Sequence, residues 1–167
     1  GIFELPSQYH TIPSTESVTK EQMSALIGVK FKDILEMPDK RPPIIIDIST
    51  SWASRYILDA ASQGLLDVYP NHTFQPQKIV TRAEMAETLP RLIRQLQRQG
   101  FRFVQQIPPE RIQIEDVSPD NFYYRPIVMM LSYGLMTLQG GRRFNPDRPA
   151  SGTDAMQHLD LILALIR

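Results

Sequence analysis

The stretch that decides the fold is residues 74–93, FQPQKIVTRAEMAETLPRLI. Within it Thr81 is followed three residues later by Glu84, which is the spacing of a capping box. In a capping box the hydroxyl and the carboxylate each accept a backbone N–H at the start of a helix. Val80 and Met85 flank this cap and can pack on each other as a hydrophobic staple. We therefore expect a helix to begin directly after Thr81.

The apolar residues of this helix recur at helical spacing. Counted from Met85, they follow four, seven, eight and eleven positions later as Leu89, Leu92, Ile93 and Leu96. Residues at these intervals lie on one face of an α-helix. The helix should therefore have one buried side. Pro90 removes a backbone N–H in its interior, so we expect a kink or a break there.

The residue pattern of this stretch recurs elsewhere in the chain. Together with Gly64 before it and Leu96 after it, its Phe-x-Pro and apolar positions reappear downstream, all at one constant offset, as Gly134, Phe144, Pro146, Ala155, Leu159, Ile162, Leu163 and Ile166. A weaker copy lies upstream, where Thr19 and Gln22 form a second capping box. Such repetition indicates related units that bury their faces against one another. We predict one shared core that contains Met23, Ile27, Met85, Leu89, Leu159 and Ile162.

Composition narrows the class of function. A chain of 167 residues, 42% of them hydrophobic, can form one domain or about three small units around one core. Lys+Arg and Asp+Glu are equal at 18 each, so no overall positive field favours nucleic acid as a partner. The absence of cysteine excludes disulfides, thiolate nucleophiles and cysteine metal sites. No apolar run approaches the ~20 residues of a transmembrane helix.

No residue pattern predicts catalysis, a cofactor or a metal. A hydrolase needs a nucleophile with a base, or two carboxylates with different pKa values, and neither is present at a recognisable spacing. His10, His72 and His158 are scattered and fit a loop, a turn and a helix surface rather than a metal site. Asp47 and Asp116 each precede a helix and fit caps or turns. We expect a protein that is not an enzyme.

Further elements follow from local signals. Helices are expected over about residues 52–64 and 124–132, while residues 1–17 are expected to form a loop. Residues 44–48 fit a short strand or a buried extended segment. Arg91, Arg94 and Arg98 share one helix face, which we interpret as a solvated face rather than a surface for an anionic polymer.

Two expectations concern the third repeat and the turns before the helices. The final helix is apolar nearly all round, which indicates burial on several sides or docking on a neighbour. Asn71 and Gly141 share one turn position, where both residue types tolerate positive φ. We therefore expect the same turn in both units.

Together these residues resemble an S-layer homology (SLH) repeat. The resemblance rests on a composite pattern: Asp47-Ile48, Ser51-Trp52-Ala53, the helix end at Gly64, residues 69–76 (YPNHTFQP) and residues 80–84 (VTRAE). Phe122 takes the place of Trp52 in the later copy. That copy departs from the pattern with Ser151-Gly152-Thr153-Asp154 where the family has Thr-Arg-Ala-Glu. The earliest copy has Thr19-Lys20-Glu21-Gln22 at this position.

The resemblance implies a mainly α fold, namely a pseudo-threefold module with a central three-helix bundle and short outer helices and turns. Residues 1–43 would be a truncated first unit and linker, and residues 44–98 the second unit. Residues 99–111 would connect it to the third unit, residues 112–167. Because the chain begins inside a repeat, we expect it to be a piece of a longer protein whose upstream domains, such as helical repeats, are partners.

The resemblance also implies a function and a binding site. SLH modules attach proteins to the bacterial cell envelope, outside the cytoplasm, by binding acidic polysaccharide without catalysis. Arg82 would contact this ligand from the helix start, where the dipole favours anions. Trp52 would form a wall of the groove, and Lys20 would partly replace the arginine in the first unit.

The alternative is an SLH-like domain that has lost glycan binding and serves in protein interaction or scaffolding. An accessory subunit of an enzyme is a third class, and no residue supports it. Two substitutions follow from the glycan interpretation. Arg82→Ala should weaken binding and leave the fold intact, and Gly152→Arg should restore a missing cation.

Overall fold

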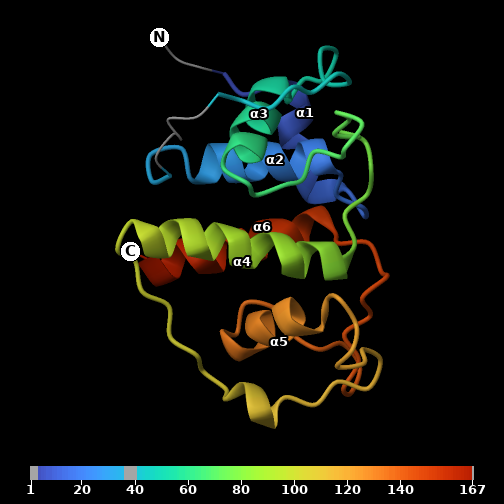
Figure 1. Ribbon diagram of the computed structural model, residues 1–167, viewed down its shortest axis with the longest axis vertical. Coiled ribbons are helices and arrows are strands. Elements are labelled where there is room, and N and C mark those ends of the chain that lie inside the picture. The colour runs from blue at the N-terminus through green and yellow to red at the C-terminus, as the bar shows by residue number, and fades with distance from the viewer. Residues whose placement is uncertain (1–3, 36–40, 167) are drawn as a thin grey trace.

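Figure 1 shows a computed structural model that describes residues 4–35 and 41–166. Its α-helices are α1 (Ser7–His10), α2 (Lys20–Lys30), α3 (Ser54–Ser62), α4 (Arg82–Arg98), α5 (Tyr124–Ser132) and α6 (Gly152–Ile166). Two 3-10 helices, η1 (Ile12–Ser14) and η2 (Pro109–Arg111), complete the elements. Within the described residues only isolated β-bridges occur, and the expected mainly α class is confirmed.

Three of these helices form the middle of the molecule. In Figure 1, α2, α4 and α6 all begin on the right and end on the left, so they run in the same direction. The shorter helices lie outside them: α3 packs against α2, α5 packs against α4, and η1 packs against α6. None of the described helices is both long enough and apolar enough to cross a membrane.

The three long helices begin around a closed ring of backbone hydrogen bonds. Val80 N–H donates to Val18 O (2.8 Å), Ala150 N–H donates to Val80 O (2.9 Å), and Val18 N–H donates to Ala150 O (2.8 Å). Both predicted capping boxes follow directly, because Thr19 with Gln22 and Thr81 with Glu84 make the reciprocal bonds. The ring and the caps therefore set where α2, α4 and α6 start.

The predicted core is confirmed. Met23, Ile27, Met85, Leu89, Leu159 and Ile162 are all buried, and they belong to one continuous hydrophobic cluster. Helical spacing predicted this face because the three long helices carry the same periodicity.

Some predicted elements are confirmed and others are wrong. Helix α5 has the predicted bounds, α3 lies within its predicted range, and Gly64 and Gly134 have positive φ at the helix ends. The segment expected to be a loop at residues 1–17 contains α1 and η1 in its described part, and Ile12 is fully buried. Pro90 does not break α4, which is continuous around it. The linker expected before residue 44 lies largely outside the described residues.

The remaining differences concern exposed apolar residues and one turn. Residues 44–48 form no strand, and only one side of the segment is buried: Ile44 and Ile46 are exposed, whereas Ile45 packs against the core and Ile48 is buried. In the turn after Tyr69, positive φ occurs at His72 and not at Asn71, although Gly141 adopts it as expected. The two turns therefore differ at this position.

Gly28 allows α3 to approach α2 closely. A Cβ atom at this position would lie 2.5 Å from Cδ1 of Tyr56, a separation that real Cβ atoms do not show. Glycine inside a helix is less favourable than alanine by ~1 kcal/mol. Glycine is nevertheless required at position 28, because the Tyr56 ring packs closely on α2 there.

Leu89→Ala should reduce the free energy of unfolding by ~2–5 kcal/mol, because the fully buried side chain loses both its transfer energy and its packing. Urea denaturation measures this difference. Leu165→Ala is the control on α6, where the side chain is half exposed and a loss below ~1 kcal/mol is expected. A loss that small at Leu89 would contradict the buried face of α4.

Candidate functional site

Arg82, the first predicted ligand-binding residue, joins the start of α4 to the segment before α6. It is only 4% exposed. The guanidinium donates from Nε to Phe144 O (2.8 Å) and from Nη2 to Thr137 O (2.8 Å). It also lies over the Phe144 ring at 4.4 Å. The side chain is thus engaged with the backbone before α6 rather than with the carboxylates of its own helix.

Lys20 makes the same kind of contact one unit earlier. It is 5% exposed, and its Nζ donates to Phe74 O (2.6 Å) and to Asp67 O (3.1 Å). The ammonium also lies 4.1 Å from the centre of the Phe74 ring and 4.5 Å from that of Tyr69. Lys20 therefore binds the turn before α4 as Arg82 binds the turn before α6.

The two sets of contacts are equivalent in the repeat. Lys20 and Arg82 each follow the threonine that caps their helix. Their acceptors also occupy matching repeat positions, Phe74 with Phe144 and Asp67 with Thr137. The basic residue at this position therefore has the same structural role in both units.

Gly152 occupies the corresponding position at the start of α6 and makes a different contact. A Cβ atom there would lie 1.8 Å from Ile12 O, so the backbone of the N-terminal segment sits directly against this glycine. The Gly152 N–H donates to Thr15 O (3.0 Å). The expectation that Gly152→Arg would restore a useful cation is wrong, because no side chain fits at this position.

Trp52 lies at the contact between α2 and the segment that leads into α3. Its indole Nε1–H donates to Glu21 Oε1 (3.2 Å), and the Ser51 hydroxyl donates to Glu21 Oε2 (2.7 Å). The ring is half-buried. Trp52, Lys20 and Arg82 thus have separate partners, and the structure does not bring them together around one site.

Asp47 and Asp116 are turn residues, as expected. Each carboxylate accepts two backbone N–H groups at 2.8 Å, Asp47 from Phe74 and Gln75, and Asp116 from Phe144 and Asn145. Burial alone would raise the pKa of Asp116, but these hydrogen bonds outweigh it and lower the pKa. The carboxylates therefore fix the turns whose carbonyl oxygens Lys20 and Arg82 bind.

A groove runs beside the first turns of α4, and we call it the α4 groove. Its volume is about 270 Å³. The residues that line it are Lys20, Leu66, Asp67, Tyr69, Lys78, Val80, Glu84, Glu87, Thr88, Arg91, Phe122 and Tyr123. Phe122, in the place of Trp52, is 76% exposed, and its ring meets Tyr123 edge to face at 5.1 Å.

The charges in the α4 groove are partly paired. Arg91 donates to Asp67 (2.9 Å) and to Glu87 (2.7 Å), so it does not form the free basic stripe that its spacing with Arg94 and Arg98 suggests. Lys78 Nζ donates to the Tyr69 hydroxyl (3.0 Å), which raises the pKa of Lys78. Lys78 therefore remains a cation beside an aromatic wall.

Sequence reasoning did not select Tyr69, Lys78 or Tyr123 for this groove. Tyr69 lies in the YPNHTFQP segment, and Lys78 lies between it and the cap, so both were within the recognised pattern. What was not apparent is that residues as far apart in the sequence as Lys20, Lys78 and Phe122 line one groove. The constant offset between repeats, which places Phe122 at the Trp52 position, was the available signal.

His158 was expected on a helix surface, and this is wrong. It is buried on the inner side of α6, and its Nδ1 has no hydrogen-bond partner among the described residues. Burial lowers the pKa of His158. In the part of the chain that the structure describes, no group of three or more His, Asp or Glu side chains is placed to hold a metal ion.

Arg82→Ala should reduce the free energy of unfolding by ~1–3 kcal/mol, since the buried carbonyl of Phe144 loses its charged donor and the partly buried bond to Thr137 O is lost as well. These contacts replace the earlier expectation that the substitution leaves the fold intact. Arg94→Ala, at an exposed position of the same helix, is the matched control and should change stability by less than ~0.5 kcal/mol. Equal effects in urea denaturation would show that Arg82 does not join the units.

The stability contributed by Lys20 should rise with pH. Burial, and then repulsion from Lys78, lowers the pKa of Lys20 from 10.5 to about 8. Between these values the unfolded chain binds more protons than the folded protein, so raising the pH favours folding. The free energy of unfolding of the wild type, minus that of Lys20→Met, should therefore increase between pH 7.5 and pH 10 in urea titrations. A constant or falling difference would mean that Lys20 is solvated.

Comparison with known proteins concerns the part of the chain that includes Phe74 and Arg82. No curated protein matches the chain. Residues 46–86 match the family model of the S-layer homology domain, and this stretch holds α3, the turn at Phe74 and the start of α4. The match supports the S-layer homology family for these residues, and it thereby indicates a module for association with the cell envelope.

Proposed function

We propose that this protein is a non-catalytic attachment module that binds an acidic polysaccharide of the cell envelope, outside the cytoplasm, in the α4 groove. The observation that carries the proposal is the exposed Phe122 ring facing a groove that also holds Lys78 and Lys20. The SLH match over residues 46–86 supports the class of function. The chemistry of the groove supports the class of ligand.

The groove has the groups that a charged sugar requires. An aromatic ring can pack on the apolar C–H face of a sugar, and Phe122 and Tyr123 offer such rings at the groove wall. Glu84 and Glu87 can accept hydrogen bonds from sugar hydroxyls. An acidic substituent would pair with Lys78, because an ammonium and a carboxylate form a charge-assisted hydrogen bond. All of these groups line the α4 groove, so one ligand could contact them together.

The three residues first proposed to bind ligand have different places in this proposal. Lys20 lines the α4 groove, although two carbonyls already accept its protons. Trp52 belongs to the equivalent position beside α2, where a second ligand contact is proposed on its half-exposed ring. Arg82 is proposed to support the site through the backbone that it holds.

The unit boundaries are part of the same proposal. Residues 44–98 and 112–167 would be two units, with residues 99–111 between them and residues 1–43 forming the first, truncated unit. The α4 groove would then lie where the second unit meets the third. Equivalent contacts of Lys20 and Arg82 support this division.

A second function is favoured by one observation of its own. Helix α6 exposes leucines, and this surface fits a protein-interaction domain better than a glycan site. In that case the α4 groove would be a remnant without ligand. Glycan binding and protein binding use different faces, so they can be tested separately.

Phe122→Ala should weaken binding of purified envelope polysaccharide at least ~10-fold, about 1.4 kcal/mol, through loss of the stacking surface. Lys78→Gln should weaken binding of the acidic polysaccharide more than binding of a chemically neutralised sample of it. Isothermal calorimetry measures both. Val104→Ala, which removes an equally exposed side chain (79%) outside the groove, should leave affinity unchanged.

The fold must be intact in each variant, and circular dichroism and thermal melting check this. Because Phe122 and Val104 are both exposed, neither substitution should shift the melting temperature appreciably. Absence of binding by the wild type to every envelope polysaccharide and peptidoglycan fraction would refute the attachment function and favour protein interaction.

A further inference from the structure

His158 is buried where α6 meets the segment that leads into it from α5. The residue is 9% exposed, and its Nδ1 has no hydrogen-bond partner among the described residues. The ring is hydrogen-bonded to the backbone of Leu135, and this bond uses Nε2 because Nδ1 is unpaired. Histidine is the side chain that ordinarily changes its charge between pH 5 and pH 8. A buried and half-satisfied histidine therefore makes this contact sensitive to pH.

Arg82 of α4 holds the same segment of the chain. Its guanidinium donates to the carbonyl oxygens of Thr137 and Phe144. Two side chains, Arg82 and His158, thus hold the backbone of residues 135–144 against the long helices. We call this set of hydrogen bonds the His158 contact.

The charges around His158 do not favour a second cation. Arg82 faces it from α4, and the carboxylate of Asp154 faces it from α6. Asp154 also attracts Arg82, which is further influenced by Arg148 and Asp116 from the segments outside these helices. Asp154 would therefore have to balance Arg82 and a protonated His158 together.

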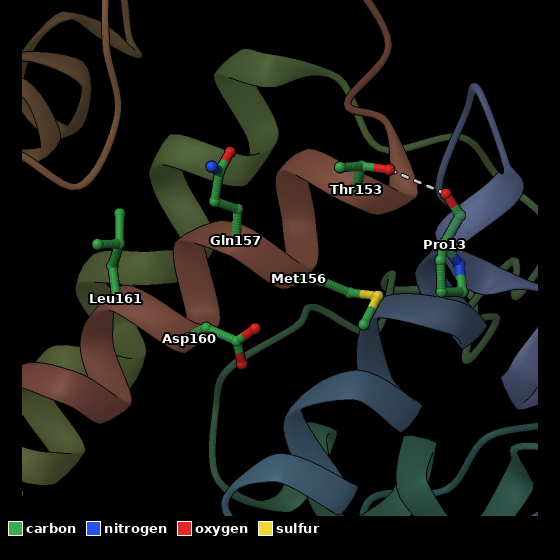
Figure 2. A pocket seen from close by; sticks show the side chains of 6 residues that line it. All are labelled: Pro13, Thr153, Met156, Gln157, Asp160 and Leu161. Carbon is green, nitrogen blue, oxygen red and sulfur yellow. Dashed lines mark hydrogen bonds between the residues drawn. The ribbon is translucent and has the colours of Figure 1, made fainter.

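The other carboxylate of α6, Asp160, lies on a different side of the helix. Figure 2 shows it beside a hollow of about 430 Å³ on the outer side of α6, together with Thr153 and Met156. It follows His158 by two residues, which places it about 200° around the helix axis. Lys30 of α2 donates to Asp160 (2.7 Å). Asp160 therefore does not compensate a charge on His158.

Protonation of His158 is unfavourable while the contact is closed. It would convert Nδ1 from an acceptor into a buried N–H donor without a partner, and it would add a positive charge near Arg82. Burial is the main cause that lowers the pKa of His158 from 6.5, and Arg82 lowers it further against the opposite effect of Asp154. An opened segment leaves the ring in water, where it binds a proton more readily. Lowering the pH through 6.5 therefore favours the open form.

We propose that the His158 contact is an acid-sensitive switch, in which protonation of His158 releases residues 135–144 while the rest of the module stays folded. The repeat supports a local effect, because the matching position in α4 is Thr88, whose hydroxyl donates to Glu84 O (3.0 Å). The equivalent turn at Phe74 is held by Lys20 instead, without a histidine. The proposal concerns the segment before α6 and does not depend on glycan binding.

Amide hydrogen exchange, measured by NMR on the wild-type protein and corrected for intrinsic exchange rates, tests the switch. The Phe144 N–H donates to Asp116 and the Phe74 N–H donates to Asp47, both at 2.8 Å, so the two amides form a matched pair. Between pH 7 and pH 5 the protection of Phe144, divided by that of Phe74, should fall at least ~5-fold.

Two variants identify the group that takes up the proton. His158→Gln keeps a side-chain donor for the backbone of Leu135 and removes the titration, so the protection ratio should be the same at both pH values. His10→Gln removes an exposed histidine and should behave as the wild type does. In the wild type, the ring C–H signals of His158 should shift over the same pH range in which the ratio falls, and this measurement requires no variant.

Three outcomes would overturn the proposal. One is a parallel loss of protection at Phe144 and Phe74, because the whole module would then unfold together. Another is an equal fall of the ratio in His158→Gln. The third is a fall of the ratio at a pH at which the His158 ring is still neutral, and this outcome decides the question even if the glutamine variant does not fold.

Discussion

The structure depends on how backbone carbonyl oxygens are satisfied where neighbouring units meet. The turns before α4 and α6 bring the carbonyls of Phe74 and Phe144 into the interior. A buried carbonyl without a donor costs ~1–3 kcal/mol, and a charged donor supplies the strongest compensation. Lys20 and Arg82 provide this donor from the first turn of the preceding long helix. The residues that would be selected first as ligand-binding cations are thus used to hold the module together.

The same arrangement leaves a different cation accessible in the α4 groove. With Lys20 and Arg82 engaged inside, Lys78 remains beside Tyr69 and the aromatic pair Phe122 and Tyr123. Paired acids and an arginine complete the groove and keep its net charge low. For the proposed ligand, shape and stacking would therefore count as much as charge, in a chain whose formal net charge is +0.

Local signals predicted the helices well and the long-range contacts poorly. The capping boxes at Thr19 and Thr81 and the bounds of α5 were apparent because each depends on residues within one or two turns. The partners of Arg82 could not be predicted, because every residue has a backbone carbonyl and the sequence does not show which distant one a side chain will bind. Gly152 was interpreted as a position that lacks a cation, whereas its role is to leave room for Ile12 O.

The candidate site also combines a part that the sequence could predict with a part that depends on long-range contacts. The repeat offset could place Phe122 at the Trp52 position, because both residues belong to the same part of the repeated pattern. The packing of the units against one another was needed to place Lys78 in the same groove. Sequence periodicity therefore identifies equivalent positions within units, and it does not identify the surfaces formed between them.

The contact between Gly152 and the carbonyl of Ile12 makes one joint of the ring different from the other two. Lysine, arginine and glycine stand at the three equivalent helix starts; the first two meet equivalent phenylalanine carbonyls, whereas the glycine meets Ile12 O. An arginine placed against Ile12 would collide with it, and a glycine placed against Phe144 would leave that oxygen without a donor. The ring therefore has two joints that a basic side chain closes and one that backbone contact closes, so a threefold repeat in sequence gives a joint at α6 that is not interchangeable with the other two.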